Sequence, residues 1–136
     1  MVEVARRYIG VPYKYGGTDK KGIDCSGLVC RVYQEALQLS LPRTAQAQAQ
    51  VGKPVRRQLQ PGDLVFFREP KAKEITHVGI VSEVKKGEVR FIHASSRGVR
   101  EDSLADSHWR QRYVMARRVL ASPPSINRKR SGQQGK

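Results

Sequence analysis

Apolar residues recur at helical spacing in the segment that carries both cysteines. The positions on this apolar face are Leu28, Val29, Val32, Ala36 and Leu39. A loop rich in glycine and proline, residues 11–24, precedes them, and Asp24 has the side chain of a good N-cap. Pro42 stops any continuation of the helix. The pattern therefore predicts a helix over residues 25–37.

The second half of the chain has the residue pattern of strands. β-Branched and aromatic runs, bounded by turn residues, predict strands over residues 63–67, 76–84, 88–95 and 112–120. An Ala/Gln-rich stretch, residues 44–50, is expected to form a short helix. A long helix followed by a run of strands favours an α+β fold with an antiparallel sheet.

The two central strands form a hairpin whose register matters for two histidines. A two-residue turn at Lys86-Gly87 pairs His93 with Ile80 and turns His77 to the other face of the sheet. Bringing both imidazoles to one face requires an odd-length turn or a bulge, and the sequence does not determine which one occurs.

The length of 136 residues fits one domain with a sizeable core. The last part of the chain reads "ASPPSINRKRSGQQGK", with prolines, polar residues and a basic cluster. We expect a folded domain over residues 1–120 and a basic, disordered tail over residues 121–136.

The charge balance is the strongest compositional signal. The chain has 26 Lys and Arg against 12 Asp and Glu, a net charge of +14. Such a surface attracts polyanions such as nucleic acid, anionic lipid or acidic wall polymers, although charge runs are most often a solvated face. The aromatic residues are not interleaved with the basic ones as base stacking requires, so a specific nucleic-acid partner is disfavoured.

The cysteines are expected to have separate roles. Five positions apart on one helix, Cys25 and Cys30 have Cα atoms about 8–9 Å apart, too far for a disulfide. The helix N-terminus is expected to lower the pKa of the Cys25 thiol, whereas Cys30 is expected to be a small buried residue. A zinc site that adds His77 and His93 is disfavoured, because the cysteines diverge on their helix.

The histidines decide whether Cys25 is a nucleophile. His77 and His93 fall on neighbouring strands, and packed against the start of the helix they would supply a base and its orienting partner. The alternative is that both are ordinary strand residues. His108, beside Trp109, is interpreted as a surface or packing residue.

Seven motifs stand in the order typical of one family. They are "GVPYKYGG", "GIDCSGLV", "LPRTAQAQ", "LQPGDLVFF", "THVGIV", "FIHASS" and "RYVMARRV". Over Ile9 to Leu120 the chain resembles the NlpC-type papain-like cell-wall peptidases. The resemblance implies a reduced papain-like fold, in which a helix bearing the cysteine packs on a central antiparallel sheet.

The resemblance also implies catalytic roles. Cys25 would be the nucleophile, His77 the base and His93 the third, orienting residue. The hydroxyl of Tyr13 and the backbone N–H of Cys25 would hold the oxyanion. The family requires neither metal nor cofactor.

The implied substrate is a peptidoglycan stem peptide, cut between γ-D-glutamate and diaminopimelate or lysine. Asp24, Ser26 and Tyr13 match residues that line the substrate groove, and Arg43 and Gln48 match positions expected to give structural support. Two enzyme hypotheses stay open, a peptidase and an amidase or acyltransferase that acts on another amide or ester. A catalytically silent wall-binding or nucleic-acid-binding module is the remaining alternative.

The expected setting is the cell envelope or the exterior, with the protein acting as a monomer. The N-terminus has no apolar stretch of the kind found in signal peptides, so a cytoplasmic location is the alternative.

Overall fold

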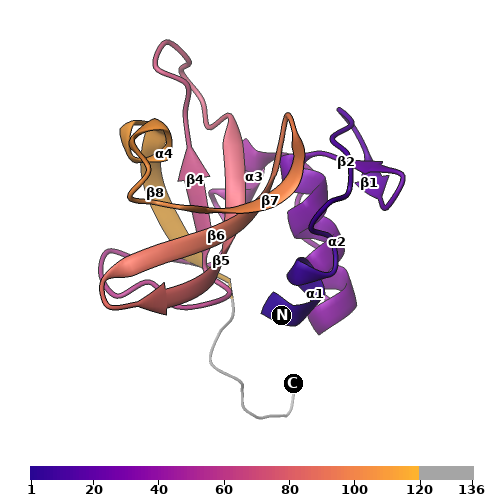
Figure 1. Cartoon of the computed structure of the whole chain (residues 1–136), viewed down its shortest axis with the longest axis horizontal. Coiled ribbons are helices and arrows are strands. Elements are labelled where there is room, and N and C mark those ends of the chain that lie inside the picture. Colours follow the sequence, from indigo (N-terminus) through magenta and orange to yellow (C-terminus); the bar gives the residue numbers. More distant parts are fainter. Residues whose placement is uncertain (120–136) are drawn as a thin grey trace.

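Six strands pair into one antiparallel sheet in the computed structural model, which describes residues 1–119 (Figure 1). Their order across the sheet is β3-β8-β4-β5-β6-β7. The strands span Lys53–Pro54 (β3), Leu64–Phe67 (β4), His77–Lys85 (β5), Glu88–Ser95 (β6), Gly98–Ser103 (β7) and Tyr113–Arg118 (β8). The expected α+β class is confirmed, whereas the expected tail lies outside the described residues.

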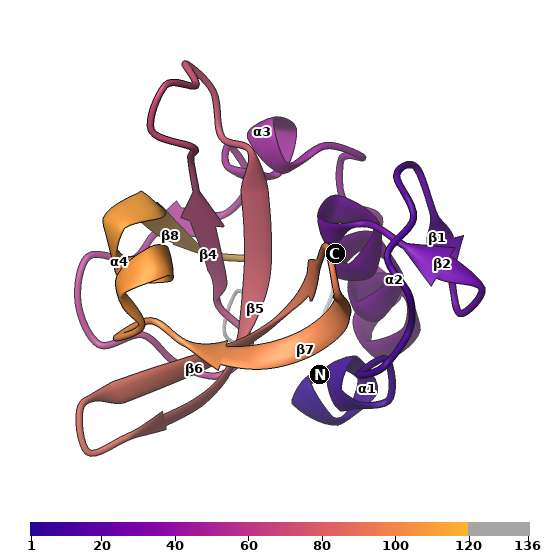
Figure 2. The same cartoon turned by 45° about the horizontal axis from the view of Figure 1, so that its top comes forward.

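Helices lie on both sides of this sheet. They span Val2–Arg6 (α1), Cys25–Leu37 (α2), Ala45–Gln48 (α3) and Ser107–Arg112 (α4), and a small separate ladder joins Thr18–Asp19 (β1) to Gly22–Ile23 (β2). Figures 1 and 2 show α1 and α2 on one side of the sheet and α4 on the other. No helix within residues 1–119 is both long and apolar enough to cross a membrane.

The predicted helix of residues 25–37 is confirmed at both of its ends. Asp24 is the N-cap, and its carboxylate accepts a hydrogen bond from the Gly27 N–H at 2.8 Å. The helix ends at Gln38, which adopts a left-handed conformation with φ of 55°. The buried face of α2 consists of Ser26, Gly27, Leu28, Val29, Val32 and Tyr33.

Alternate residues of the central strands build two cores, one on each face of the sheet. Leu64, Phe66, Val78, Ile80 and Ile92 face α1 and α2. The other face carries Val65, Phe67, Val81, Phe91 and Ala116, and Trp109 of α4 packs against them. The sheet is therefore covered on both sides, as its period-two pattern requires.

A bulge at Ser82 resolves the register of the hairpin. Near its tip Lys85 pairs with Glu88, as the sequence predicts, but the ladder then shifts and Val81 pairs with Phe91. Ser82 is the extra residue of the bulged strand. The shifted register brings His93 to the same face as His77, so the bulge is the device that the two-histidine hypothesis required.

Several short elements were not expected from the sequence. They include the strands β1, β2 and β3, and strand β7 and helix α4 occupy a stretch between the predicted strands. The short helix α3 is confined to Ala45–Gln48 within the expected range of residues 44–50, with Thr44 as its N-cap. The strand expected over residues 112–120 is confirmed as β8.

Candidate active site

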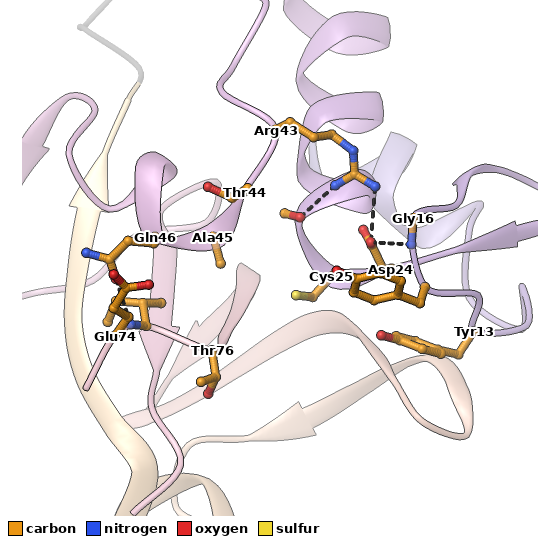
Figure 3. A pocket seen from close by; sticks show the side chains of 13 residues that line it. Tyr13, Gly16, Asp24, Cys25, Arg43, Thr44, Ala45, Gln46, Glu74 and Thr76 are labelled. Atoms are coloured by element: carbon orange, nitrogen blue, oxygen red, sulfur yellow. Dashed lines mark hydrogen bonds and ion pairs between the residues drawn. The ribbon is translucent and has the colours of Figure 1, made fainter. Parts of the chain in front are cut away.

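A cavity of about 610 Å³ opens beside the first turn of α2, a size typical of small-molecule sites. One wall comes from the loop before α2 and from the first turn of α2 itself, and the other from α3 and the segment that leads into β5. The lining residues are Tyr13, Tyr15, Gly16, Asp24, Cys25, Ser26, Arg43, Thr44, Ala45, Gln46, Glu74, Ile75 and Thr76. Figure 3 shows the Cys25 sulfur pointing into the space between the two walls.

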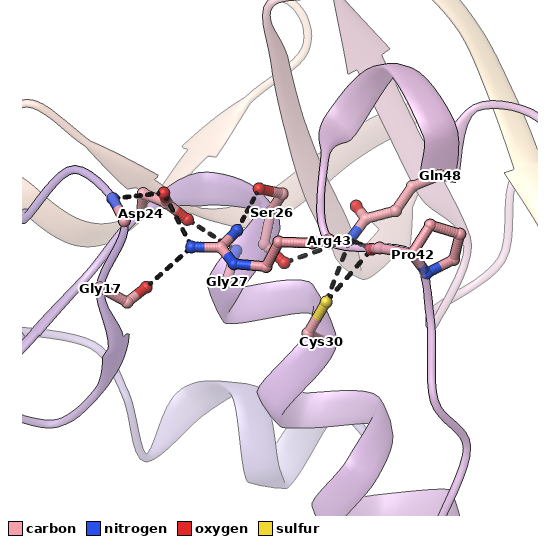
Figure 4. Close-up of polar contacts among 9 residues, drawn as sticks. Gly17, Asp24, Ser26, Gly27, Cys30, Pro42, Arg43 and Gln48 are labelled. Carbon is pink, nitrogen blue, oxygen red and sulfur yellow. Dashed lines mark hydrogen bonds and ion pairs between the residues drawn. The ribbon is translucent and has the colours of Figure 1, made fainter.

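Arg43 clamps the residues on either side of the cysteine. One terminal nitrogen of its guanidinium donates to the Asp24 carboxylate at 3.0 Å, and the other donates to the Ser26 hydroxyl at 2.7 Å (Figure 4). Asp24 also accepts from the Gly16 N–H at 2.8 Å. Burial alone would raise the pKa of Asp24, but the hydrogen bonds from Arg43 and the backbone outweigh it and lower the pKa.

Gly27 allows this turn to pack closely on the preceding loop. A Cβ atom at this position would lie 2.3 Å from the Gly17 carbonyl oxygen. Since non-bonded atoms do not approach so closely, the Cys-Ser-Gly order has a steric reason. The loop and the cysteine-bearing turn are thereby held in contact.

Gln48 supports the same turn from beneath. Its fully buried amide donates to the backbone carbonyls of Ser26 at 3.2 Å and Pro42 at 2.8 Å (Figure 4). These contacts, like those of Arg43, are of the structural kind that the sequence suggested for both residues.

Cys30 differs from the expectation of a buried apolar residue. Its side chain is half-buried, and its sulfur lies 3.3 Å from the Pro42 carbonyl oxygen and 3.4 Å from the Gln48 amide nitrogen. The expectation failed because the chain returning through Pro42 places carbonyl groups over this face of α2. Both cysteines are free thiols.

Tyr13 reaches the cavity from the loop that runs beside β2. The segment is held by a bridge between Tyr13 and Ile23, two residues before Cys25. Its ring is 41% exposed, and Figure 3 shows its hydroxyl directed toward the cavity that also holds the Cys25 sulfur. Burial and the nearby Cys25 and Asp24 charges raise the pKa of Tyr13.

The pKa of Cys25 shifts opposite to the expected direction. Burial raises the pKa of this thiol, and the Asp24 carboxylate beside it acts the same way. Hydrogen bonds from the backbone N–H groups of Val78, Ser26 and Cys25 lower the pKa, but by less than burial raises it. The expectation of a lowered pKa was therefore wrong, because desolvation exceeds the stabilisation that the helix N-terminus gives the thiolate.

The two strand histidines form a hydrogen-bonded pair. His77 Nε2 lies 2.8 Å from His93 Nδ1, and the two rings stand almost perpendicular at 89°. Gly79, which falls opposite His93 in the shifted register, leaves room for two side chains of β6, since a Cβ there would lie 2.7 Å from Phe91 Cδ2 and 3.2 Å from the His93 Cβ. His93 is fully buried and His77 half-buried.

Aromatic rings enclose this pair on the sheet face that carries α4. Trp109 stacks on His77 with a centroid separation of 5.2 Å and meets His93 edge-on at 4.7 Å. Phe67 and Phe91 complete the enclosure. Burial lowers the pKa of His77 to about 3 and also lowers the pKa of His93.

The expectation was that both imidazoles pack against the start of the helix. Their rings lie on the sheet face that carries α4, and Cys25 approaches the start of β5 from the α2 side, where its sulfur faces the backbone N–H of Val78. Within residues 1–119, no hydrogen bond joins the Cys25 sulfur to the His77 ring. In free enzymes such contacts are commonly long and tighten only with substrate.

Sequence reasoning missed two members of the histidine side. Asp102 of β7 accepts from His93 Nε2 at 2.7 Å, and Trp109 covers both rings. A large apolar side chain among charged residues was the signal that could have identified Trp109. No such signal existed for Asp102, because β7 was not predicted. His108 has an exposed ring that packs on Trp109 at 4.5 Å, in agreement with its interpretation.

The described residues contain no cluster of three His, Cys, Asp or Glu side chains arranged to hold a metal ion. The candidate site therefore consists of a thiol beside a cavity, two linked imidazoles at the start of the adjacent strand, and a clamped carboxylate.

Residues 10–118 match the sequence profile of the NlpC/P60 family. A relative from Escherichia coli K12, named murein DD-endopeptidase MepS/murein LD-carboxypeptidase, is 46% identical over 114 residues, which are 82% of this chain and 57% of the relative. A γ-DL-glutamyl hydrolase from Bacillus subtilis 168 is 43% identical over 87% of this chain and 28% of its own length. The chain thus spans little more than half of the first relative and less of the second.

Solved structures share the fold. A Staphylococcus aureus Mu50 protein, described as similar to a lipoprotein of the NLP/P60 family, superposes with a TM-score of 0.76 at 35% identity, covering 88% of this chain and 40% of that one. RipD from Mycobacterium tuberculosis, described as a non-catalytic NlpC/p60 domain protein, gives 0.68 at 22% identity, covering 88% and 94%. The fold alone therefore does not establish catalysis.

Proposed function

Because this chain belongs to the NlpC/P60 family, we propose that it is a cysteine peptidase that hydrolyses an amide bond in peptidoglycan stem peptides. The observation that carries the proposal is the placement of Cys25. Its sulfur opens into a cavity of about 610 Å³ and abuts the start of the strand whose first residue is His77. A non-catalytic wall-binding domain has no need for that combination.

The first step moves the thiol proton to His77. Since Nε2 of His77 is engaged by His93, the nitrogen left to accept this proton is Nδ1. The raised pKa of Cys25 and the lowered pKa of His77 favour the neutral pair at rest. We therefore propose that the proton transfers as the sulfur attacks the carbonyl carbon, rather than before substrate binds.

The remaining steps follow from this geometry. The carbonyl oxygen becomes an oxyanion, for which the Cys25 N–H and the Tyr13 hydroxyl are the proposed donors. His77, now an imidazolium, gives its proton to the leaving amine, and the C–N bond breaks to leave a thioester on Cys25. Water, deprotonated by His77, then releases the acid and restores the thiol.

The proposed scissile bond joins γ-D-glutamate to diaminopimelate or lysine. The name of the Bacillus subtilis relative, a γ-DL-glutamyl hydrolase, supports it, whereas the name of the Escherichia coli relative points to a DD bond. The masses of the products distinguish these bonds.

Asp24 and Ser26 are proposed to contact the substrate from the cavity wall, together with Tyr13. The Asp24 carboxylate already accepts from three donors, the N–H groups of Gly16 and Gly27 and the guanidinium of Arg43. A carboxylate offers about four acceptor positions, so one remains for a donor on the peptide.

The chemistry of the substrate sets the proposed location and contacts. Peptidoglycan lies outside the cytoplasmic membrane, so we propose the cell envelope, where a net charge of +14 favours contact with anionic wall polymer. We propose that the protein acts there as a monomer, without cofactor.

The test uses purified muropeptides of known sequence, with products identified by mass spectrometry. The wild-type chain is expected to cut them, Cys25→Ala to be inactive, and Cys30→Ala, which alters the other cysteine of the same helix, to keep its activity. Equal cleavage by Cys25→Ala would overturn the proposal. Binding of peptidoglycan without cleavage by the wild type would assign the chain to the wall-binding alternative.

A further inference from the structure

A carboxylate extends the histidine pair to a third hydrogen-bonded group. His93 uses Nδ1 toward His77 at 2.8 Å and Nε2 toward the Asp102 carboxylate at 2.7 Å. The His93 ring is fully buried, while the Asp102 side chain is 18% exposed. Arg100 Nε lies 3.2 Å from the same carboxylate oxygen and fixes it from the solvent side.

The pairing of β6 with β7 places Asp102 at this position. Asp102 stands opposite Phe91, and Arg100 stands opposite His93. Since Asp102 and Arg100 are two residues apart on β7, Asp102 lies on the same face of the sheet as the His93 ring. Its neighbour Glu101 stands opposite Ile92 and therefore faces the other side of the sheet. Only one of these two adjacent acids can reach His93.

The carboxylate dictates where the imidazole protons lie. An ionised carboxylate only accepts, so Nε2 of His93 must carry the hydrogen and Nδ1 of His93 must present a lone pair. His77 then donates through Nε2, which leaves its own Nδ1 without a hydrogen. That is the tautomer in which Nδ1 of His77 can take a proton from Cys25.

We propose that Asp102 is a positioning residue, which acts through His93 to hold His77 in the tautomer that accepts the thiol proton. It touches neither substrate nor the reacting sulfur. The inference rests on the proposed function for its catalytic consequence, but the tautomers themselves are a property of the resting protein.

The first measurement is ¹⁵N NMR of the histidine-labelled chain at neutral pH, since protonated and unprotonated ring nitrogens differ strongly in chemical shift. The wild type is expected to carry Nε2–H on both His77 and His93. In Asp102→Asn the amide can donate to His93 Nε2, so both rings are expected to shift toward Nδ1–H. Glu101→Gln, the adjacent acid on the opposite face, is the control and is expected to leave both tautomers unchanged.

The second measurement is muropeptide cleavage by the same proteins. Asp102→Asn is expected to lower kcat about 10- to 100-fold with little change in KM, which is the usual range for a group that orients a catalytic side chain. Glu101→Gln is expected to stay within about 2-fold of the wild type. Asp102→Glu, which keeps a carboxylate, is expected to recover part of the lost kcat.

Two results would overturn the inference. One is unchanged tautomers in both Asp102→Asn and Asp102→Ala, and the other is a change of tautomer with kcat unaltered. Failure of the proposed function gives a different signature, full activity of Cys25→Ala, and does not alter the NMR result.

Discussion

On the thiol side of the site, charged and polar contacts hold the side chains at an open cavity, whereas on the histidine side aromatic rings enclose a hydrogen-bonded chain that ends at Asp102. Asp24 is fixed by two backbone N–H groups and by Arg43, at the edge of an open cavity. The rings of His77 and His93 lie instead beneath Trp109, among aromatic neighbours. Hydrogen-bond donors therefore fix the thiol side, whereas aromatic side chains shield the histidine side from water.

The difference explains how Cys25 and His77 can both remain uncharged at rest. Burial lowers the pKa of His77 to about 3, and it raises the pKa of Cys25 despite the backbone N–H groups around the sulfur. Both shifts disfavour an ion pair in the free protein. In the proposed mechanism, charge therefore develops only while a substrate fills the cavity.

His77→Gln is expected to have the largest effect, and it acts on the histidine side alone. The glutamine amide cannot accept the thiol proton, while the register of the hairpin, with Val81 opposite Phe91, is kept. Loss of the base is expected to lower kcat/KM on muropeptides by about 10²–10⁴-fold.

Ser82→Ala is the control on the same strand. It keeps the bulge and removes only the hydrogen bond from Ser82 to Glu101. It is expected to retain activity within a few-fold. If His77→Gln were as active as Ser82→Ala, His77 would not be the base.

Acid is expected to destabilise the histidine side before the thiol side. The folded pKa of His77, about 3, lies below the ordinary value of 6.5, so the unfolded chain binds a proton that the folded chain refuses. The free energy of unfolding therefore falls as the pH drops from 6.5. The lowered pKa values of Asp24 and Glu101 act only below their ordinary values of 3.8 and 4.5.

Urea unfolding at several pH values between 6.5 and 4.5 measures this loss. We expect about 2 kcal/mol over that range, since one group contributes at most about 1.4 kcal/mol per pH unit. His77→Gln is expected to flatten most of the slope, and His93, whose pKa is also lowered, to account for the rest. The same slope in wild type and His77→Gln would assign the effect elsewhere.

Arg43→Ala is expected to have a smaller effect on stability, and it tests the thiol side. The variant removes the donor to Asp24 and Ser26 from a guanidinium that is 43% exposed. We expect a loss of about 1 kcal/mol in the free energy of unfolding, together with a rise in the pKa of Asp24. Urea unfolding and a carboxylate NMR titration measure the two effects.

Arg31→Ala serves as the control for the clamp. Arg31 pairs with Glu35 four residues along α2, and both side chains are well exposed. Such pairs contribute about 0.3–0.5 kcal/mol. Equal losses in the two variants would mean that Arg43 forms only a surface ion pair.

The same contrast decides what the sequence could predict. The thiol side depends on local signals, so the N-cap Asp24 and the helix Cys25–Leu37 were predicted at their observed positions. Strands β4, β5, β6 and β8 were also predicted, because alternation and turn residues are local. The resemblance to a known family gave the pairing of His77 with His93, which spacing alone left open.

The histidine side depends on long-range pairing, which a single sequence does not show. No residue near Ser82 signals a bulge, because the shift is set by how two strands pack on two cores. The segment Gly98–Ser103 has too many charged residues to be predicted as a strand, so the sequence did not indicate a role for Asp102. The predicted direction of the Cys25 pKa shift was wrong for the same reason, since the burial that raises the pKa comes from tertiary packing.

The order of the strands has a consequence for folding during synthesis on the ribosome. β8 is the last strand of the described chain, yet it lies inside the sheet, between β3 and β4. Translation delivers α2 early and this interior strand late, so a nascent chain carries Cys25 before its sheet can be completed. The sheet that holds His77 and His93 is therefore complete only when the last described strand has been made.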